Sequence, residues 1–355
     1  MNIKSTATFR ILVTGAEFHG SDSGGLARAF RRLGHLVQIV DEDRYSPAFL
    51  GFIPRLIRKA IRPVSVREFN REILRQCESF EPHFVLVCKG TMVAPWALLQ
   101  LKQKGRYLMN FYPDVSFMCH GPLIPQCLPI YDHIFTTKTF GIADMKSQLN
   151  VTNSEFIPHG FDPDLHRLMT ISSEDMERFG VDASFIGTWS PKKTAFLAEL
   201  AKTLPGIHLR VWGSQWEKAD SPSLKPHIAG VTVTGDIFPF MLQCTKINIA
   251  ILSEARAGAS SGDLITSRTF HIPASGGFML HERTDELLEY YNEGEEVACF
   301  STPEEMAEKV KYYLDHEDER ERIRLAGHRR CVAENSFDHR ARKIVELYSE
   351  RSRTT

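Results

Sequence analysis

Short runs of β-branched and apolar residues recur along this chain, and segments with helical periodicity lie between many of them. Residues 9–14 form one such run, which ends at Gly15, and residues 23–33 then repeat apolar side chains at helical spacing. Runs of this kind are typical of strands that are buried on both faces of a parallel sheet. Strands that alternate with helices are joined by right-handed crossovers. The pattern therefore predicts an α/β protein with doubly wound sheets.

The alternation occurs in two series, and 355 residues exceed what one ordinary core organises. In the first half we expect strands at 9–14, 36–40, 84–88, 107–111, 133–137 and 155–157. In the second half we expect strands at 183–187, 208–212, 231–234, 247–252 and 277–280. Helices are expected near 95–103, 140–149, 304–315, 317–334 and 337–350. We predict two Rossmann-like domains, at 1–165 and 181–335, and a C-terminal helix within 336–355 that can pack back on the first domain.

Charge is nearly balanced over the whole chain, with 43 Lys and Arg against 44 Asp and Glu. Residues 50–75 are the exception, because they hold seven basic and two acidic side chains. One basic segment on a neutral protein is no basic face, so we expect no nucleic-acid partner. Residues 49–62 have the pattern of a basic amphipathic helix, which suits an anionic membrane or acceptor, or the domain's own core. Peripheral membrane contact through residues 50–62 is therefore one predicted interaction.

The sequence predicts no metal site. The seven cysteines form no C-x-x-C pair and no His–Cys cluster at zinc spacing. Residues 41–43, Asp-Glu-Asp, contain the D-x-D pattern with which some sugar transferases hold a metal, but a solvated acidic turn is the favoured explanation. No apolar run approaches the ~20 residues that span a bilayer, and residues 1–10 lack the apolar region of a secretory signal. We expect a cytoplasmic protein, with any membrane contact at the inner face.

Ligands of doubly wound sheets bind beyond the carboxyl ends of the strands, so the turns that follow strands carry the candidate residues. The first such turn, residues 15–25, does not match the G-x-G-x-x-G dinucleotide fingerprint. Its Gly24 and Gly25 still stand at a helix N-terminus, where bare N–H groups can face a phosphate or sugar oxygen. A turn that simply requires a pair of glycines explains them equally well.

A stronger signal follows the strand expected at 183–187. Ser190 and Pro191 have the N-cap and first-position preferences of a helix start. Lys192 and Lys193 then occupy the first turn, where the helix dipole disfavours cations. We expect their ammonium groups to face a bound diphosphate. The alternative is two solvated lysines at a helix end.

A third candidate turn spans residues 263–277. Asp263 and His271 are eight positions apart, which suits two groups that project from a loop and the following helix into one pocket. The imidazole of His271 can bond ribose hydroxyls. It can equally be a core histidine, since its neighbours in the sequence are apolar.

Several segments, taken in order, resemble those of GT-B glycosyltransferases. Residues 23–40 are similar to the "GG…L…GHeV" opening of that fold, and residues 157–163 to the "IPnGvD" segment that ends its first domain. The second half resembles the CgeB-type, or spore-maturation-type, glycosyltransferase-like proteins at 267–276, 295–300, 304–306 and 312–316. The resemblance extends from about residue 9 to about residue 345.

This resemblance implies two Rossmann-like domains that face a cleft, with a nucleotide-sugar donor held by the second and the acceptor by the first. It implies no metal or other cofactor, so that Lys192, Lys193 and helix N-termini would neutralise the diphosphate. Arg268 matches the family's arginine and would contact the donor phosphate or fix its loop. Ser275 and Gly276 match the small pair that lets the helix approach the nucleotide closely.

The chain departs from the family at His271, where a Glu usually bonds the ribose hydroxyls. That Glu is the second carboxylate of the E-x7-E motif of retaining enzymes, and Asp263 falls at the first. A neutral histidine in its place removes an acceptor-only partner for two hydroxyls.

The expected function is transfer of a hexosyl or related sugar from a uridine or guanosine diphosphate to a glycan, lipid-linked or protein acceptor. An inverting reaction needs a general base at the acceptor hydroxyl. Asp114 and His120 follow the strand at 107–111, and Asp114 is the favoured base; Asp263 is the third candidate catalytic residue. The alternatives are a non-catalytic nucleotide-sugar or glycan-binding protein, an epimerase, or a phosphorylase of the same architecture.

Overall fold

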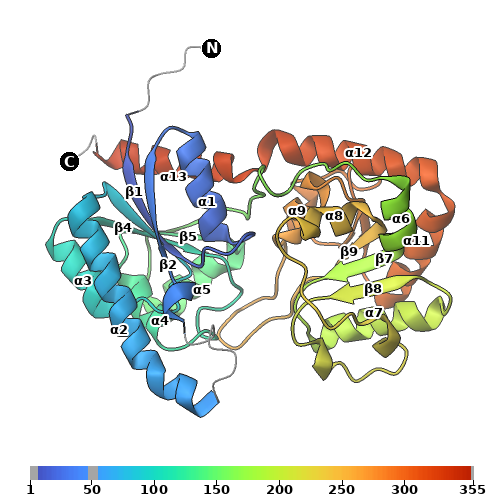
Figure 1. Ribbon diagram of the computed structural model, residues 1–355, viewed down its shortest axis with the longest axis horizontal. Helices are drawn as coiled ribbons and strands as arrows, with labels where there is room; N and C mark the ends of the chain where they lie inside the picture. The colour runs from blue at the N-terminus through green and yellow to red at the C-terminus, as the bar shows by residue number, and fades with distance from the viewer. Residues whose placement is uncertain (1–6, 47–54, 353–355) are drawn as a thin grey trace. The chain divides into compact units, whose positions relative to one another are not determined.

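The computed structural model describes residues 7–46 and 55–352, and the chain divides into two compact units (Figure 1). Unit 1 comprises Met1–Pro158, Ala255–Ser261 and Phe337–Thr355. Unit 2 comprises His159–Glu254 and Gly262–Ser336. Residues 159–180, expected in part as a connection, thus belong to unit 2, where Ser172 and Asp175 form a capping box at the start of α6 (Ser173–Phe179).

Unit 1 is built on a six-stranded parallel sheet with the order β2-β1-β3-β4-β5-β6. Its strands are β1 (Arg10–Gly15), β2 (Leu36–Asp41), β3 (Phe84–Cys88), β4 (Tyr107–Tyr112), β5 (His133–Thr136) and β6 (Ser154–Phe156). The side chains of Ile11, Leu12 and Val13 on β1 have no exposed surface. Burial on both faces explains why these strands are uninterrupted apolar runs in the sequence.

Alternate residues of each strand point to opposite faces of this sheet. Since both sets are apolar, each face packs against helices. On one face, α1 (Asp22–Arg32) and α13 (Phe337–Ser352) enclose a core that includes Phe30, Phe84 and Ile344. The other face is covered by α2 (Arg55–Phe80), α3 (Pro95–Gln103), α4 (Leu123–Cys127) and α5 (Thr139–Leu149). The helix α13 lies along α1, where Arg32 and Asp338 form an ion pair of 2.7 Å.

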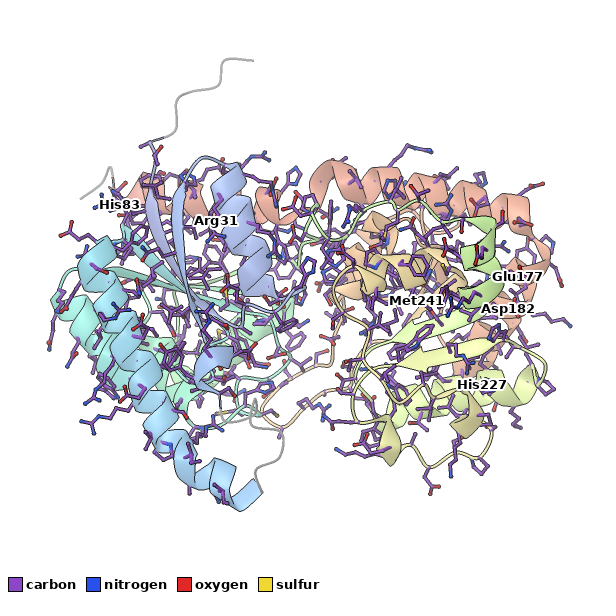
Figure 2. The ribbon with its side chains drawn as sticks, viewed as in Figure 1. Arg31, His83, Glu177, Asp182, His227 and Met241 are labelled. Atoms are coloured by element: carbon purple, nitrogen blue, oxygen red, sulfur yellow. The ribbon has the colours of Figure 1, made fainter. Side chains whose placement is uncertain are left out.

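Unit 2 repeats the plan with a five-stranded parallel sheet of order β11-β10-β9-β7-β8. Its strands are β7 (Val181–Ile186), β8 (Leu209–Trp212), β9 (Thr245–Ala250), β10 (Met279–Glu282) and β11 (Ala298–Phe300). The helices α7 (Pro191–Thr203), α11 (Pro303–Asp315) and α12 (Glu317–Glu334) contribute to the main core. A smaller cluster joins Val181 and Trp212 to Met241 on α8 (Ile237–Gln243) (Figure 2).

The predicted strand at 231–234 is wrong. Gly230 and Gly235 have φ angles of +68° and +61°, so the chain turns at both ends of the segment. Val231 is 57% exposed and belongs to no strand, whereas a valine in a buried strand would have little exposed surface. The three-residue strand β11 takes a place in the sheet that the sequence pattern did not indicate.

The basic segment expected at 49–62 falls partly outside the described residues. Residues 49–54 lie there, and the described helix α2 begins at Arg55 and continues to Phe80. Among the described residues, none of the helices has both the length and the apolarity that a bilayer crossing requires.

Candidate functional site

The carboxyl ends of β7, β9 and β10 meet in unit 2, and α7 begins there. Ser190 is the N-cap of α7 and Pro191 its first residue, as the sequence predicts. The Ser190 hydroxyl accepts a hydrogen bond from the Lys193 amide at 3.4 Å. The N–H groups of this helix start form a place that favours an anion.

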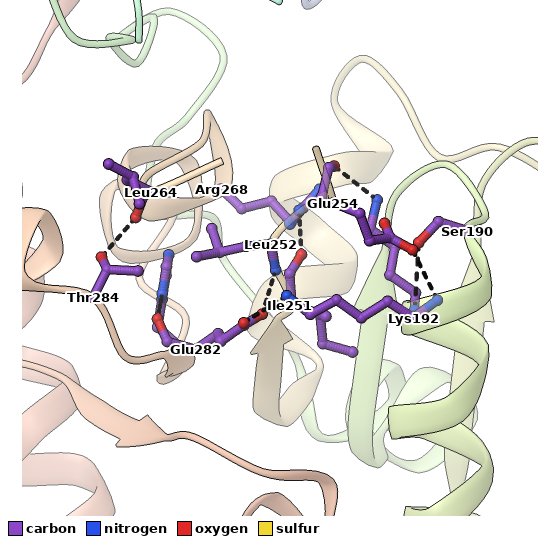
Figure 3. Close-up of polar contacts among 12 residues, drawn as sticks. Ser190, Lys192, Ile251, Leu252, Glu254, Leu264, Arg268, Glu282 and Thr284 are labelled. Carbon is purple, nitrogen blue, oxygen red and sulfur yellow. Dashed lines mark hydrogen bonds and ion pairs between the residues drawn. The ribbon is translucent and has the colours of Figure 1, made fainter. Parts of the chain in front are cut away.

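That place is occupied by a carboxylate of the chain itself. Oε1 of Glu254, which follows β9, accepts from the Lys192 amide at 2.9 Å, and its side chain bonds Ser190 (Figure 3). Burial raises the pKa of Glu254, but the hydrogen bonds from Ser190 and Lys192 and the Lys193 charge outweigh it, so the pKa lies below its usual value. Glu254 is therefore an ionised group at the start of α7. No sequence signal singled it out, although a Glu directly after a buried strand is a pattern worth testing.

The two lysines at this helix start have different environments. Nζ of Lys192 forms an ion pair of 2.6 Å with Oε1 of Glu282 at the end of β10, whose other oxygen accepts from the Leu252 amide (Figure 3). Lys193 is only 4% exposed, and its ammonium group donates to the Thr188 carbonyl and the Ser253 hydroxyl. The ammonium group of Lys193 joins the loop after β7 to the loop after β9, and its contact with a diphosphate stays a prediction.

Arg268 begins α9 (Arg268–Ala274) and holds the loop that precedes it. Nη2 donates to the Ile251 carbonyl at 2.7 Å, and the guanidinium lies 5.1 Å from the centre of the Phe185 ring. Burial lowers the pKa of Arg268, while the charges of Asp263 and Glu282 act in the opposite direction. The backbone of Asp263 is fixed by its amide, which donates to the Ser253 carbonyl at 2.9 Å. These contacts correspond to the loop-fixing role; contact with a donor phosphate stays a prediction.

His271 points into the protein's own chain. Its Nε2 donates to the Gly160 carbonyl at 3.1 Å, and its ring stacks on His166 with the centroids 3.9 Å apart. Nδ1 of His166 in turn accepts from the Asp162 amide at 3.0 Å. These contacts fasten α9 to the 159–166 segment of unit 2. Bonding of ribose by His271 stays a prediction.

The small pair after α9, Ser275 and Gly276, permits close packing against Leu168. Gly276 has a φ of +75°, and a Cβ there would lie 2.4 Å from a methyl carbon of Leu168. Ser275 is fully buried, and its hydroxyl has no hydrogen-bond partner among residues 7–46 and 55–352. The close approach that the small residues allow is therefore observed with protein; approach of a nucleotide stays a prediction.

In unit 1, the amides of Gly24 and Gly25 are not bare. Ser21 is the N-cap of α1: its hydroxyl accepts from the Gly24 amide at 3.1 Å and its carbonyl from the Gly25 amide at 2.9 Å. A Cβ at position 25 would lie 2.6 Å from the Phe337 ring, so Gly25 permits α13 to pack on α1. Both amides thus already donate within the chain, and a donor-binding role of Gly24 and Gly25 stays a prediction.

Asp114 and His120 do lie together, beyond the carboxyl end of β4. Nε2 of His120 is 3.2 Å from Oδ2 of Asp114, and Nζ of Lys89 is 2.7 Å from the same oxygen. Each of the three side chains is about one-third exposed. Lys89 was missed by sequence reasoning, although it directly follows the predicted strand at 84–88 and precedes a glycine.

The loop that carries Asp114 and His120 is held by hydrogen bonds within unit 1. The Tyr112 hydroxyl donates to the Ser116 carbonyl at 2.7 Å, and the Thr137 hydroxyl donates to the Pro113 carbonyl at 2.8 Å. The Ser116 hydroxyl donates to the carbonyl of Ala257, in the inserted segment 255–261, at 2.6 Å. The candidate side chains are thus presented by a fixed loop, which favours a defined geometry.

The acidic residues 41–43 form a hydrogen-bonded turn. Oδ1 of Asp41 accepts from the amides of Glu17 and Asp43, and the Glu42 side chain accepts from the Thr91 hydroxyl. No group of three or more His, Cys, Asp and Glu side chains that could hold a metal ion is found in the part of the chain that the structure describes.

Comparisons with known proteins match one part of the chain by sequence and nearly all of it by fold. Residues 192–346 match the glycosyl transferase-like family model. No curated protein sequence matches the chain. Among solved structures, sucrose-phosphate synthase of Thermosynechococcus elongatus has a TM-score of 0.69 at 12% identity, and the match covers 98% of this chain and 100% of that one.

Two further structures match over nearly their full length. A glycosyltransferase of Rickettsia africae has a TM-score of 0.64 at 14% identity, covering 97% of this chain and 99% of that one. HepE of Anabaena, solved with UDP-glucose, has a TM-score of 0.63 at 9% identity, covering 98% and 100%. At these identities the likeness is one of fold. It confirms the predicted class, GT-B, with two Rossmann-like parallel sheets.

Within residues 192–346 the chain is similar to the glycosyl transferase-like family, and over nearly its full length it shares the GT-B fold with the solved structures. The matches do not distinguish the CgeB-type proteins within that class, so the narrower resemblance stays a prediction.

Proposed function

We propose that the chain transfers a sugar from a nucleoside diphosphate to an acceptor hydroxyl, as a CgeB-like member of the GT-B glycosyltransferases. The observation that carries this proposal is the glycosyl transferase-like match over residues 192–346, seated on a fold shared over its full length with glycosyltransferases. Because the HepE structure of the same fold contains UDP-glucose, a UDP-sugar is the first donor to test.

The donor is proposed to bind at the carboxyl edge of the unit 2 sheet. Negative charge develops on the diphosphate as it leaves, and preorganised dipoles and cations stabilise that charge. The start of α7 and the ammonium group of Lys192 supply such groups. Each contacts a carboxylate: Glu254 accepts from the helix start, and Glu282 pairs with the lysine. Donor binding would therefore exchange these carboxylates for phosphate oxygens.

The acceptor is proposed to bind at the carboxyl edge of the unit 1 sheet, beside Asp114 and His120. A carboxylate and an imidazole in contact form a pair that can take a proton from a hydroxyl. Their one-third exposure leaves both within reach of a ligand. A glycan, lipid-linked or protein acceptor would present the same hydroxyl chemistry. Peripheral contact of α2 with a membrane is part of the proposal for a lipid-linked acceptor.

The reaction is proposed to need no metal, since Lys192 and the start of α7 meet the leaving-group charge. The experiment incubates the protein with UDP-glucose, UDP-N-acetylglucosamine and GDP-mannose, with and without a chelator, and measures release of the nucleoside diphosphate. We expect release from one donor, unchanged by the chelator. Nucleotide binding without release from any donor, alone or with sugar acceptors, would contradict the proposal.

A second candidate is a nucleotide-sugar or glycan-binding protein without catalysis. The specific observation in its favour is that the helix start expected to hold diphosphate is occupied by Glu254. The same donor panel separates the two candidates. A binding protein has a higher melting temperature when a nucleotide sugar is present, because the ligand stabilises the folded state, but it does not cleave the nucleotide sugar.

A further inference from the structure

We propose that a groove between α2 and α3, on the surface of unit 1, binds the anionic headgroup of a membrane phospholipid. The proposal rests on the membrane contact that the proposed function gives to α2, and it names the class of lipid that this contact recognises. Phosphatidylglycerol, whose phosphodiester carries a negative charge, is a lipid of this class.

The groove lies between the outward sides of two neighbouring helices (Figure 1). On α3, the side chains of Ala97, Leu98 and Leu101 are buried. Trp96 and Gln100, one turn apart, are exposed on the other side of the same helix. The groove has a volume of about 620 Å³, which falls within the usual size of small-molecule sites. Its lining includes Val66, Arg67, Arg71 and Leu74 of α2 and Trp96 and Gln100 of α3.

The charges beside the groove favour an anion. Residues 55–67 of α2 include five basic and no acidic residues. The carboxylate that follows, Glu68, is paired with Arg71 at 2.6 Å. The side chain of Arg67 has no ion-pair or hydrogen-bond partner among residues 7–46 and 55–352. Its guanidinium group is therefore available to bond two oxygens of a phosphate, a geometry that suits the planar fork of donors.

The apolar side chains on the same two helices favour a lipid over a soluble phosphate or a sugar. Trp96 is 40% exposed, and Ile57, Val64 and Leu99 are exposed as well. Exposed apolar side chains that gather on one surface mark an interaction site. An indole ring is well placed between lipid headgroups and acyl chains, because it has an apolar body and an N–H donor. A sugar could stack on the ring but would leave the aliphatic side chains in water.

The groove thus offers two kinds of contact to one amphiphilic ligand. Arg67 can bond the phosphate, and the side-chain amide of Gln100 can bond the glycerol hydroxyls. Val66, Leu74 and Trp96 can cover the upper part of the acyl chains. A soluble phosphate would make only the first kind of contact, and a lipid without net charge would lack the attraction of the basic residues on α2.

The first test uses Trp96 as a reporter in the full chain. The other three of the four tryptophans, Trp189, Trp212 and Trp216, belong to unit 2. Vesicles of phosphatidylglycerol with bromine on the upper acyl chain should quench part of the tryptophan emission, and Trp96→Phe should lose that part. Brominated phosphatidylcholine should quench little. The proposal is overturned if the wild type is not quenched, if the two lipids quench equally, or if Trp96→Phe is quenched like the wild type.

The second test asks whether the groove or the net charge recognises the headgroup, by sedimentation with phosphatidylglycerol vesicles. Arg67→Gln should weaken binding about fivefold, the loss expected for one basic group near an anionic surface. Arg75→Gln removes the same charge from the same helix, but Arg75 pairs with Glu72 and lies outside the groove lining, so binding should stay close to that of the wild type. Gln100→Trp fills the groove without a change of charge and should also weaken binding. Equal weakening in the two arginine variants, or unchanged or tighter binding in Gln100→Trp, overturns the proposal.

Other occupants of the groove give different results. Glycerol 1-phosphate that binds as tightly as soluble dihexanoyl phosphatidylglycerol would make the groove a site for a soluble phosphate. Self-association of the lipid-free protein that Trp96→Phe and Arg67→Gln abolish would make it an interface between two copies of the chain. Either result overturns the assignment to a lipid.

The donor panel, run without lipid, keeps this proposal separate from the proposed function. Arg67→Gln should release the nucleoside diphosphate at the wild-type rate, because the groove takes no part in donor cleavage. Release by a wild type that does not bind phosphatidylglycerol vesicles would contradict the groove proposal alone. Vesicle binding by a wild type that cleaves no donor would contradict the proposed function alone.

Discussion

The carboxyl edges of the two sheets differ in how their charges are matched. In unit 1, a single carboxylate oxygen of Asp114 serves both Lys89 and His120, and all three groups are partly exposed. In unit 2, two of the groups expected to bind phosphate each contact a carboxylate. The backbone at the start of α7 contacts Glu254, and the ammonium group of Lys192 pairs with Glu282. Both edges lie at the carboxyl ends of parallel strands, yet in unit 1 one carboxylate is shared by two basic side chains, whereas in unit 2 each of these two groups has a carboxylate of its own.

The difference shows that a shared fold fixes where a site lies but leaves its electrostatic state to a few side chains. Unit 1 has a carboxylate and an imidazole that lie in contact and are partly exposed. In unit 2, the carboxylate of Glu254 occupies the candidate anion site at the start of α7. A phosphate that binds there would have to displace this carboxylate. The predictions that follow alter one edge at a time.

The largest effect is expected from the unit 1 edge. Asp114→Asn removes the carboxylate that is the favoured base of the proposed transfer, and we expect the transfer rate to fall by about 10²-fold or more, as for loss of a positioned acid–base group. The measurement is kcat with a donor that the panel identifies. Asp132→Asn, whose carboxylate pairs with Lys102 before β5, is the matched control and should retain the rate. A full rate in Asp114→Asn would remove this cluster from the mechanism.

Unit 2 should respond more strongly to acid than unit 1 because it encloses His281. This imidazole is fully buried, and burial lowers its pKa from 6.5 to about 4. Below pH 6.5 the unfolded chain takes up a proton that the folded chain refuses, so stability falls as the pH drops towards 4 and levels off below it. The full effect is about 3 kcal/mol of unfolding free energy.

Denaturant unfolding between pH 7 and pH 4, followed by the tryptophans Trp189, Trp212 and Trp216 of unit 2, measures this loss. His281→Gln should be less stable at pH 7 and should depend less on pH. An equal pH dependence in that variant would show that other groups cause the acid sensitivity.

The start of α7 should bind anions more tightly when the Glu254 side chain carries no charge. Glu254→Gln keeps the shape of the side chain and its bond from the Lys192 amide but removes a negative charge from the start of α7. We expect UDP and inorganic pyrophosphate to bind about tenfold more tightly, measured by calorimetry at low salt. Glu199→Gln, on the same helix, is the control. Weaker binding would mean that Glu254 itself contacts the ligand or holds the site in shape.

A smaller effect is expected from the cap of the same helix. Ser190→Ala removes the hydroxyl that accepts from the Lys193 amide and bonds Glu254. Loss of an N-cap costs about 1 kcal/mol of unfolding free energy, which chemical denaturation can measure. Ser190→Asp should recover the cap but place a second carboxylate beside Glu254, so it should restore less stability than an isolated cap would. Full recovery of the unfolding free energy in Ser190→Asp would indicate that a charge at position 190 does not repel Glu254.

The sequence predicts the parts of this molecule that depend on local pattern. Buried strands such as 84–88 and the start of α7 at Ser190 and Pro191 carry their signals within a few residues. The error at 231–234 has a local cause as well, since the glycines at both ends of that segment turn the chain.

The site depends on contacts that no local pattern contains. Glu254 reaches the Lys192 amide 62 positions away, and Lys89 reaches Asp114 from the loop that follows the neighbouring strand β3. Lys193 looks like a solvated or phosphate-binding residue in the sequence, and only the loop after β9 makes it a buried structural one. Which charge is matched, and by which partner, is set by tertiary packing.

The smallest effect is expected on the outer surface, where the two units also differ. Residues 55–67 of α2 include five basic and no acidic residues, whereas α12 of unit 2 begins with Glu317, Asp318 and Glu319. Ile57 and Val64 are exposed on α2, and Trp96 and Leu99 are exposed on the neighbouring α3. Cations beside exposed apolar side chains suit an anionic membrane surface.

Sedimentation with vesicles of phosphatidylglycerol, compared with phosphatidylcholine alone, tests this surface. Lys59→Glu should weaken binding to the anionic vesicles by about fivefold or more, since one basic group near such a surface contributes about 1 kcal/mol and the new carboxylate is repelled by it. Lys311→Glu on α11 makes the same charge change in unit 2 and should have little effect, because the acidic side chains around that surface disfavour the membrane. Equal loss in both variants would mean that net charge alone drives binding. No binding by the wild type at low salt would remove the membrane from the proposal and leave α2 as the cover of its own core.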